Sequence, residues 1–395
     1  MSTSSKHDRA FVLVLGTLVG LAPLTIDMYL PALPALAREF NATAAHTQLT
    51  LASYLIGLAI GQFAYGMLTD RFGRKPPLYV GLALYALASL GCAVAPNMDA
   101  LIVLRFIQAL GGCAGIVIPI AVVRDRFAQR EAAQVLSRLM LVMGVAPMLA
   151  PLAGAQLLDW FGWRAIFGVL AVVAVLCLAG IHVVLEETLP RERMKPIRLD
   201  TVLGTYRLLL TDRRYLAFGL AGACAGAAMF SYISASPFVF IEQFGVAPTH
   251  YSMIFGMNAF MLIAASQLNH RVLARGAHPD RVLQRALWCM AIAATALLAG
   301  AFAGIFGVAG VVLPLLCFMG TLGFITPNAQ AGAMAGHGAH AGTASALLGT
   351  LRYGAATLAG LGVGAGGHLS AGAMAVAIGV CAATALLAYR IKGAD

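Results

Sequence analysis

Long apolar runs separated by short polar stretches make up nearly the whole of this 395-residue chain. A helix needs about 20 apolar residues to cross the hydrocarbon core of a bilayer, so each run predicts one membrane-spanning helix. Six runs precede a longer polar stretch and six follow it. The predicted spans lie near residues 11–31, 47–68, 78–95, 100–123, 135–158, 165–185, 216–241, 253–273, 286–304, 308–329, 342–364 and 371–389.

This pattern predicts an all-α polytopic membrane protein with 12 transmembrane helices in two six-helix bundles. The longer polar stretch is rich in charged residues and is the expected linker between the bundles. We therefore expect an N-terminal bundle at 1–188, a cytoplasmic linker at 189–213 and a C-terminal bundle at 214–395. Two related bundles with a binding site between them, near the middle of the membrane, are typical of transporters.

The distribution of positive charge predicts how the chain crosses the membrane. Hydrophobic residues make up 60% of the chain and charged residues only 11%, yet the net charge is +10. Of the 26 Lys and Arg residues, 22 fall in segments on the same side as the N-terminus, and the opposite loops hold only Arg38 and Arg164. This asymmetry follows the positive-inside rule and predicts that both termini are cytoplasmic. The positive charge therefore reflects membrane orientation, and we expect no nucleic-acid partner.

Motifs for catalysis, metal binding and ATP hydrolysis are absent from the sequence. It contains no HExxH, GxSxG or P-loop, so we expect neither an enzyme nor an ATP-driven transporter. The seven cysteines show no CxxC or Cys/His spacing. His337 and His340 stand three apart, but no third ligand is near, so we expect a solvated loop and no metal site. We expect no cofactor, which leaves an ion gradient as the driving force.

Asp27 is a carboxylate inside the first apolar run. A charged side chain near the middle of a bilayer costs roughly 2.5 to 3.5 kcal/mol on insertion-based scales, so such residues are kept mainly where they move ions or bind a ligand. Burial disfavours the charged form of a carboxyl group, which makes Asp27 a candidate proton carrier. In a straight helix ending at Pro31, Asp27 would lie towards the outer face, whereas the apolar pattern continues to Leu36, so its depth stays open.

A ten-residue motif, GMLTDRFGRK at 66–75, lies between the second and third spans. Its glycines suit a tight turn, and its basic residues hold that turn at the inner surface. The motif resembles the G-x-L-x-D-R-x-G-R-K signature of the major facilitator superfamily and matches every fixed position. The resemblance implies the major facilitator fold and a cytoplasmic gate, with the end of span four as a partner for Asp70. The implied gate residues are Gly66, Asp70, Arg71, Gly73, Arg74, Lys75, Arg124 and Asp125.

Spans four and five carry two further motifs of that superfamily. Arg105 and Gln108 lie on one helix face and resemble the R-x-x-Q-G motif of proton-driven members, with Ala109 in place of its glycine. The resemblance implies a role in proton coupling, and snorkelling of Arg105 to the outer interface is the alternative. Span five is similar to a motif of antiporters in which prolines bend the helix and glycines permit close contact. Its matching residues are Gly144, Pro147, Pro151 and Gly154.

The narrowest resemblance covers three segments between span one and span eleven. They are IDMYLPALP at 26–34, SASPFV at 234–239 and AGTASAL at 341–347. They are similar to the bicyclomycin and chloramphenicol resistance family of drug/proton antiporters. The resemblance implies export of drugs or similar small amphipathic molecules in exchange for protons, across the bacterial inner membrane. The arrangement of six plus six spans permits a functional monomer.

Polar and aromatic residues within the predicted spans are the candidates for substrate contact. They are Tyr29, Tyr54, Tyr232, Phe238, Asn258, Asn328 and Arg352. Arg352 must face a cavity or a partner because lipid exposure is too costly, and it is a candidate counter-ion for Asp27 or the substrate, or a structural residue. Two other functions stay open. One is export of a metabolite, such as an amino acid or sugar, by the same fold. The other is a polytopic membrane enzyme or sensor, for which a catalytic cluster or soluble output domain is expected.

Overall fold

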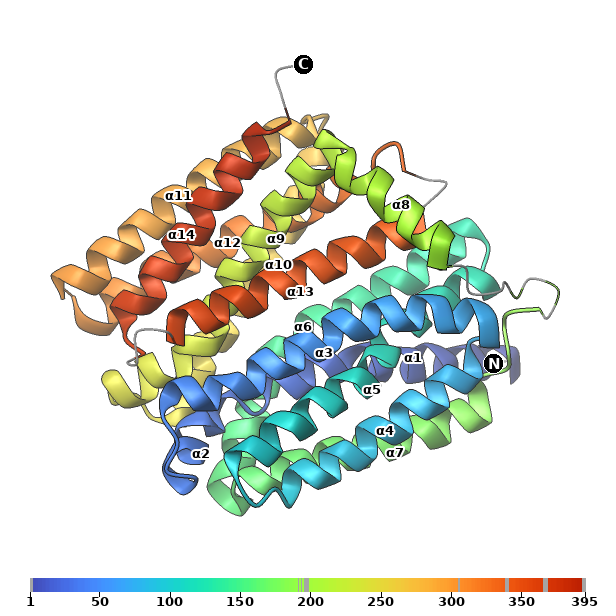
Figure 1. Cartoon of the computed structure of the whole chain (residues 1–395), viewed down its shortest axis with the longest axis horizontal. Coiled ribbons are helices and arrows are strands. Elements are labelled where there is room, and N and C mark those ends of the chain that lie inside the picture. The colour runs from blue at the N-terminus through green and yellow to red at the C-terminus, as the bar shows by residue number, and fades with distance from the viewer. Residues whose placement is uncertain are drawn as a thin grey trace. The chain divides into compact units, whose positions relative to one another are not determined.

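The computed structural model describes residues 3–190, 192, 194, 199–304, 306–337, 341–364 and 369–392, and within this part of the chain every regular element is a helix (Figure 1). Twelve helical segments are long and apolar enough to cross a membrane, which confirms the predicted fold class. The elements of the first half are α1 (Thr3–Asp27), η1 (Leu30–Ala32), α2 (Leu33–Glu39), α3 (Ala44–Phe72), α4 (Lys75–Ala93), α5 (Met98–Arg126), α6 (Gln129–Phe161) and α7 (Trp163–Val184). Those of the second half are α8 (Leu199–Thr211), α9 (Arg213–Pro237), η3 (Phe238–Gln243), α10 (Pro248–Ala274), α11 (Pro279–Ala303), α12 (Gly307–Met334), α13 (Ala341–Gly364) and α14 (Ala371–Arg390).

By their contacts the residues group into two compact units. The first unit comprises Met1–Tyr29 and Ser53–Arg198, and the second comprises Leu30–Ala52 and Leu199–Asp395. The segment Leu30–Ala52, which the sequence-based division assigns to the N-terminal bundle, thus groups with the second unit. Within that unit, η1 packs against α9 and α10, and α2 packs against η3.

Small residues set the helix packing in the first unit, where α4 contacts α5 and α7, and α1 contacts α5 and α6. A Cβ atom added to Gly111 would lie 2.5 Å from the carbonyl oxygen of Gly81, and one added to Gly57 would lie 2.7 Å from the carbonyl oxygen of Phe106. Helices in lipid associate through such close van der Waals contact, because the hydrophobic effect does not drive them together. These glycines therefore position α3, α4 and α5 around the buried residues described below.

In the second unit α9 is the central helix and packs against α12, α13 and α14. Close approaches recur on the neighbouring helices, since a Cβ on Gly300 would lie 2.1 Å from the carbonyl oxygen of Gly310. A Cβ on Gly323 would lie 2.5 Å from the carbonyl oxygen of Leu262. The same packing rule thus holds in both units.

The first span of each half is interrupted. In the first half α1 ends at Asp27, the 3-10 turn η1 follows, and α2 continues the span, which extends over Ala10–Glu39. Asp27 therefore lies inside this span, not near its end as a straight helix ending at Pro31 would have it. In the second half α9 passes at Pro237 into η3, a π-helical turn. Interrupted helices are tolerated at membrane depth where the backbone is covered by protein or lines a cavity.

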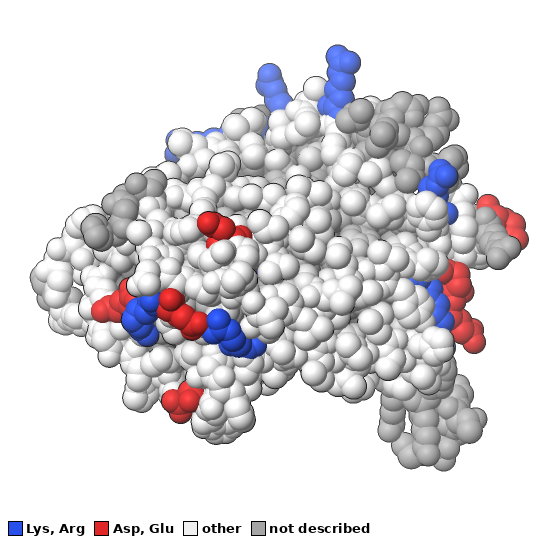
Figure 2. All heavy atoms as spheres, turned by 60° about the horizontal axis from the view of Figure 1, so that its bottom comes forward, with Lys and Arg blue, Asp and Glu red and all other residues white. Residues whose placement is uncertain are grey.

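The surface is that of a membrane protein. On the face drawn in Figure 2, most of the surface carries neither Lys or Arg nor Asp or Glu. Large apolar side chains on the spans are exposed, including Leu13 (72%), Leu87 (68%), Ile292 (68%) and Leu358 (73%). Such extensive apolar exposure would be a liability in water, whereas lipid tails cover it at no cost.

Candidate functional site

Asp27 is the last residue of α1 and is only 4% exposed. Among the residues that the structure describes, no hydrogen bond or ion pair holds its carboxylate, although Arg105 lies in the same unit. The chain continues from Asp27 into Met28, whose amide still donates to the carbonyl of Leu24 at 3.0 Å, before the helix breaks. A buried acidic group at a helix break is thus the central feature of the first unit.

Arg105 on α5 is fully buried, at 0% exposure, so its side chain does not snorkel to an interface. Its guanidinium carbon lies 4.3 Å from the ring centroid of Tyr54, 4.5 Å from that of Tyr29 and 5.8 Å from that of Phe167. Its Nη1 donates to the carbonyl oxygen of Thr25 at 3.3 Å. Aromatic faces attract a desolvated cation strongly, by about 2 kcal/mol or more. The ring quadrupoles and this carbonyl therefore stabilise Arg105, since no carboxylate of the described residues lies at hydrogen-bonding distance from it.

Gln108 connects Arg105 to the neighbouring helix α4. Its Oε1 accepts from Arg105 Nη1 at 2.7 Å, and its Nε2 donates to Ser89 Oγ at 2.7 Å. Ser89 Oγ in turn donates to the carbonyl of Tyr85 at 2.7 Å. Buried polar networks of this kind fix one arrangement of their members, because an unpaired group would carry the full desolvation penalty. Arg105 and Gln108, three residues apart on one face of α5, thus contact each other directly.

Helix α6 carries the span-five motif and packs directly against the end of α1. Pro147 and Pro151 lie inside the helix, and a Cβ atom added to Gly154 would lie 1.7 Å from the carbonyl oxygen of Met28. Gly144, at the other end of the motif, is half-buried. Only glycine permits the contact at Gly154 without displacing backbone, because the atoms it faces belong to the main chain of α1's terminus. The motif therefore determines where the segment carrying Asp27 rests.

Arg74 is the centre of the turn between the second and third spans. Its Nη1 lies 2.8 Å from Asp70 Oδ1 and its Nε lies 2.8 Å from Asp125 Oδ2. The predicted link between Asp70 and the end of span four is thus made through Arg74. Of the other predicted gate residues, Arg71 lies over the ring of Phe72, and Lys75 and Arg124 make no ion pair among the described residues. A Cβ atom at Gly66 would meet nothing within 4 Å. Asp70, Arg74 and Asp125 all belong to the first unit.

Glu187 is a member of this cluster that the sequence does not reveal. Its carboxylate accepts from the backbone amides of Arg74 at 2.8 Å and Lys75 at 3.0 Å, and so caps the N-terminus of α4. Gly73 has φ +84°, a left-handed conformation that favours glycine, and a Cβ there would lie 2.6 Å from Glu187 Oε2, so a larger residue would also push the Glu187 carboxylate aside. The sequence carries no signal for this contact, because Glu187 follows span six and is more than a hundred residues away.

The two carboxylates change the electrostatics of Arg74. Burial alone would lower the pKa of its guanidinium, but the hydrogen bonds to Asp125 and Asp70 outweigh burial and raise the pKa above its ordinary value. Arg74 therefore stays charged at any pH of biological interest. Such a cluster is held by charge-assisted hydrogen bonds, which are about twice as strong as neutral ones.

The remaining substrate candidates lie in the second unit and do not form one cluster. Tyr232 stacks on Phe255 with 5.7 Å between ring centroids. Asn328 Nδ2 donates to Asn269 Oδ1 at 2.8 Å. Asn258 is fully buried and its Oδ1 has no hydrogen-bond partner in the described part of the chain. Two candidates complete this set, Arg352, which is half-buried beside Gly226, and Phe238, which begins η3.

His337 has a structural contact in the second unit. Its Nε2 lies 2.8 Å from Asp212 Oδ2, and Asp212 also caps α9 by accepting from the amides of Arg214 and Tyr215. Burial would raise the pKa of Asp212, but these amide hydrogen bonds and His337 together lower it below its ordinary value. His340 lies outside the described residues, and among those described no group of three or more His, Cys, Asp or Glu is arranged to hold a metal ion.

Comparison with known proteins identifies the family. The family model described as Major Facilitator Superfamily matches residues 15–361. An uncharacterized MFS-type transporter of Bacillus subtilis, YdgK, is 38% identical over 351 residues, which is 88% of this chain and 87% of the relative. A bicyclomycin resistance protein homolog of Haemophilus influenzae is 31% identical, with 97% of this chain and 96% of the relative covered.

Two further comparisons extend this result. The chloramphenicol resistance protein of Pseudomonas aeruginosa is 32% identical, with 86% of this chain and 80% of the relative covered. Among solved structures, a D-xylose-proton symporter has a TM-score of 0.74 at 16% identity, with 98% of each chain covered, and so has the same fold. The resemblance of the sequence motifs to proteins of bicyclomycin and chloramphenicol resistance is thereby confirmed.

Proposed function

The chain belongs to the Major Facilitator Superfamily, and we propose that it exports drugs or similar small amphipathic molecules in exchange for protons, with Asp27 as the proton carrier. It is a multi-pass membrane transporter of small molecules and not an enzyme. Relatives named for resistance to bicyclomycin and chloramphenicol support the substrate class. We propose the inner membrane of a bacterium as its location, with both termini cytoplasmic and a monomer as the working unit.

The observation that carries the proposal is the burial of Asp27 at a helix break within a membrane span. A buried acid without a charged partner is costly to keep ionised, so it binds a proton readily while enclosed and can release it when water reaches it. In the proposed cycle, Asp27 takes up a proton in the outward-facing state as substrate leaves. In the inward-facing state it releases the proton as new substrate binds.

Arg105 and the span-five motif support this role because both contact the segment that ends in Asp27. Arg105 binds the carbonyl of Thr25, two residues before Asp27, and Gly154 contacts Met28, the residue after it. A change of charge on Asp27 would therefore alter the balance of contacts at α1's terminus. We assign Arg105 and Gln108, and the span-five motif of Gly144, Pro147, Pro151 and Gly154, the task of positioning that terminus.

The energy of one proton is sufficient. A single elementary charge crossing about 100 mV supplies roughly 2.3 kcal/mol. At about 1.4 kcal/mol for each factor of ten, this sustains a gradient of roughly fortyfold. In this scheme the cluster of Asp70, Arg74 and Asp125 is the cytoplasmic gate, because it ties the ends of α3 and α5 to the turn before α4.

The experiment is proton release on addition of substrate to purified protein in weakly buffered detergent. Chloramphenicol and bicyclomycin head the panel, and the variants are Asp27→Asn and, as a matched control, Asp159→Asn at an exposed carboxylate near the end of α6. We expect release from the wild type and from the control and none from Asp27→Asn. Equal release from all three would assign the proton to another residue. Silence from all three would refute drug exchange and direct the panel to amino acids and sugars.

A further inference from the structure

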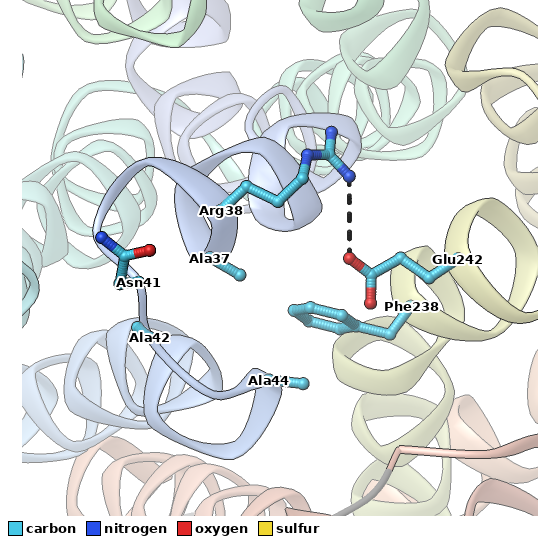
Figure 3. Close-up of a pocket in the computed structure, with 7 residues that line it drawn as sticks. All are labelled: Ala37, Arg38, Asn41, Ala42, Ala44, Phe238 and Glu242. Atoms are coloured by element: carbon cyan, nitrogen blue, oxygen red, sulfur yellow. Dashed lines mark ion pairs between the residues drawn. The ribbon is translucent and has the colours of Figure 1, made fainter.

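A pocket of about 310 Å³ lies in the second unit, where α2, the following loop, the start of α3 and the turn η3 come together (Figure 3). Two charged side chains face each other across it, Arg38 from α2 and Glu242 from η3, and the ring of Phe238 lies beside Glu242. Small side chains and an amide complete the lining, namely Ala37, Asn41, Ala42 and Ala44. The charge distribution predicts that this end of the spans faces the outside of the cell.

The local backbone is built to present these groups. Phe238 and Glu242 both belong to the π-helical turn η3. Such turns are rare in proteins, and those that occur are often found at functional sites. The end of η3 is fixed, because Gln243 Oε1 accepts from the amide of Ala371 at 2.8 Å. On the opposite side, Asn41 has φ +48° and so turns the chain from α2 into α3 around the pocket.

The two charges are close but loosely joined. Arg38 Nη1 and Glu242 Oε1 are 3.7 Å apart, too far for a hydrogen bond, and the side chains are 67% and 40% exposed. Within the described part of the chain neither side chain makes a hydrogen bond to another residue. Exposed pairs of this kind contribute little to stability, with a median of about 0 to 1 kcal/mol. A ligand can therefore separate them at small cost and give each charge a better partner.

We propose that this pocket binds a small zwitterion of the size of an amino acid. Its ammonium group lies against Glu242 and its carboxylate against Arg38. Its apolar part lies over the small side chains of Ala42 and Ala44, which also line the pocket. The volume is at the lower end of the range for ligand pockets, roughly 300 to 1,000 Å³, and suits a ligand of about the size of an amino acid. A singly charged ligand fits less well, because it pairs with one wall and meets its own sign of charge on the other.

All the residues that line the pocket belong to the second unit, whereas Asp27 belongs to the first. Binding of a zwitterion to the pocket can therefore be measured in the absence of transport. The probes are L-phenylalanine, phenethylamine and 3-phenylpropanoate, which share a phenylethyl skeleton and carry both charged groups, the ammonium alone and the carboxylate alone, respectively. Binding to purified full-length protein in nanodiscs is followed by calorimetry.

Arg38→Gln and Glu242→Gln test the two walls of the pocket. Arg275→Gln and Asp159→Asn, at exposed positions elsewhere, are the matched controls. We expect L-phenylalanine to bind the wild type and the controls about equally, and both single variants to bind it about tenfold more weakly, since each loses a charge-assisted hydrogen bond. The amine and the acid should each bind the wild type about tenfold more weakly than L-phenylalanine for the same reason.

Charge reversal keeps the proposal falsifiable if a single variant disturbs the fold. Arg38→Glu alone should abolish zwitterion binding, whereas Arg38→Glu combined with Glu242→Arg should restore it, because a zwitterion can turn around. Asp27→Asn should leave binding unchanged. The proposal would be overturned if L-phenylalanine did not bind the wild type at millimolar concentration, if either single glutamine variant bound it as tightly as the wild type does, or if Asp27→Asn lost binding. Loss in Asp27→Asn would assign the ligand to the transport path instead.

Discussion

Substituting Gly154 with alanine tests the contact that fixes the segment carrying Asp27. The new Cβ would lie 1.7 Å from the carbonyl oxygen of Met28, 2.6 Å from its carbonyl carbon and 3.0 Å from its Cα. All three are backbone atoms, so no side-chain rotation relieves the clash. Either α6 or the end of α1 has to move before an ordinary contact distance is restored.

The magnitude follows from two opposing effects. Overpacking of this kind typically costs about 1 to 3 kcal/mol. Alanine in place of glycine inside a helix gives back roughly 1 kcal/mol of helix propensity. Gly168→Ala in α7 separates the two, because nothing lies within 4 Å of a Cβ at that position. The difference in stability between the two variants is thus the cost of the clash, about 1 to 3 kcal/mol.

The assay is thermal unfolding of both variants beside the wild type, in the same detergent, together with substrate-triggered proton release. At about 2 to 4 °C for each kcal/mol, Gly154→Ala should melt several degrees below Gly168→Ala. Gly168→Ala should melt at or above the wild type and retain proton release, whereas Gly154→Ala should lose most of it. Equal melting temperatures with full proton release in Gly154→Ala would refute the argument that this contact positions α1's terminus.

Three further predictions concern the polar clusters. Glu187→Gln removes the charged cap of α4 and should lower stability by about 0.5 to 1 kcal/mol in thermal unfolding, while the exposed neighbouring change Glu186→Gln should leave it unaltered. Asp212→Asn should destabilise the protein at neutral pH. Because the folded-state pKa of Asp212 is lowered, its contribution is present above the unfolded-state value and is lost as the pH falls through the folded one, so melting curves of variant and wild type should converge in acid. Asn328→Leu leaves Asn269 Oδ1 buried without its donor and should lower the free energy of unfolding, measured with denaturant, by about 1 to 3 kcal/mol. The double variant Asn328→Leu with Asn269→Leu should recover most of this loss.

The twelve spans were predictable because the bilayer imposes length and polarity on each helix. The ends of the first span were not. Its apolar pattern predicts a helix over 11–31, whereas the span extends to Glu39 with a break after Asp27. The break leaves no mark in hydrophobicity, because the apolar pattern continues through η1 to Leu36 in α2. Pro31 and Pro34 are compatible with a turn or with a new helix start, so composition alone could not decide between them.

The candidate site shows the same limit at the level of side chains. Arg74 and Asp70 belong to one local motif, and their contact follows from a spacing of four residues. Glu187, which completes the cluster, is joined only by the packing of the chain after α7. For Arg105, the sequence left a choice between proton coupling and snorkelling. Its full burial among the rings of Tyr29, Tyr54 and Phe167 excludes snorkelling, and those partners come from segments that the sequence gives no reason to bring together.

Both halves of the chain interrupt their first span, and each interruption carries charge or aromatic chemistry. Breaking a helix at membrane depth frees backbone groups, each of which costs several kcal/mol if lipid covers it. Protein covers them in both places, because Leu30 and Ala32 in η1 are 0% exposed and Phe238 and Phe240 in η3 are at most 1% exposed. Such an arrangement needs packing from several helices, and it is no more stable than a straight helix would be. Discontinuous helices at matching positions of two halves are the feature that marks binding sites in transporters. The acid at the first break and the charged pocket at the second are therefore the two places where substitution should change transport or binding more than stability.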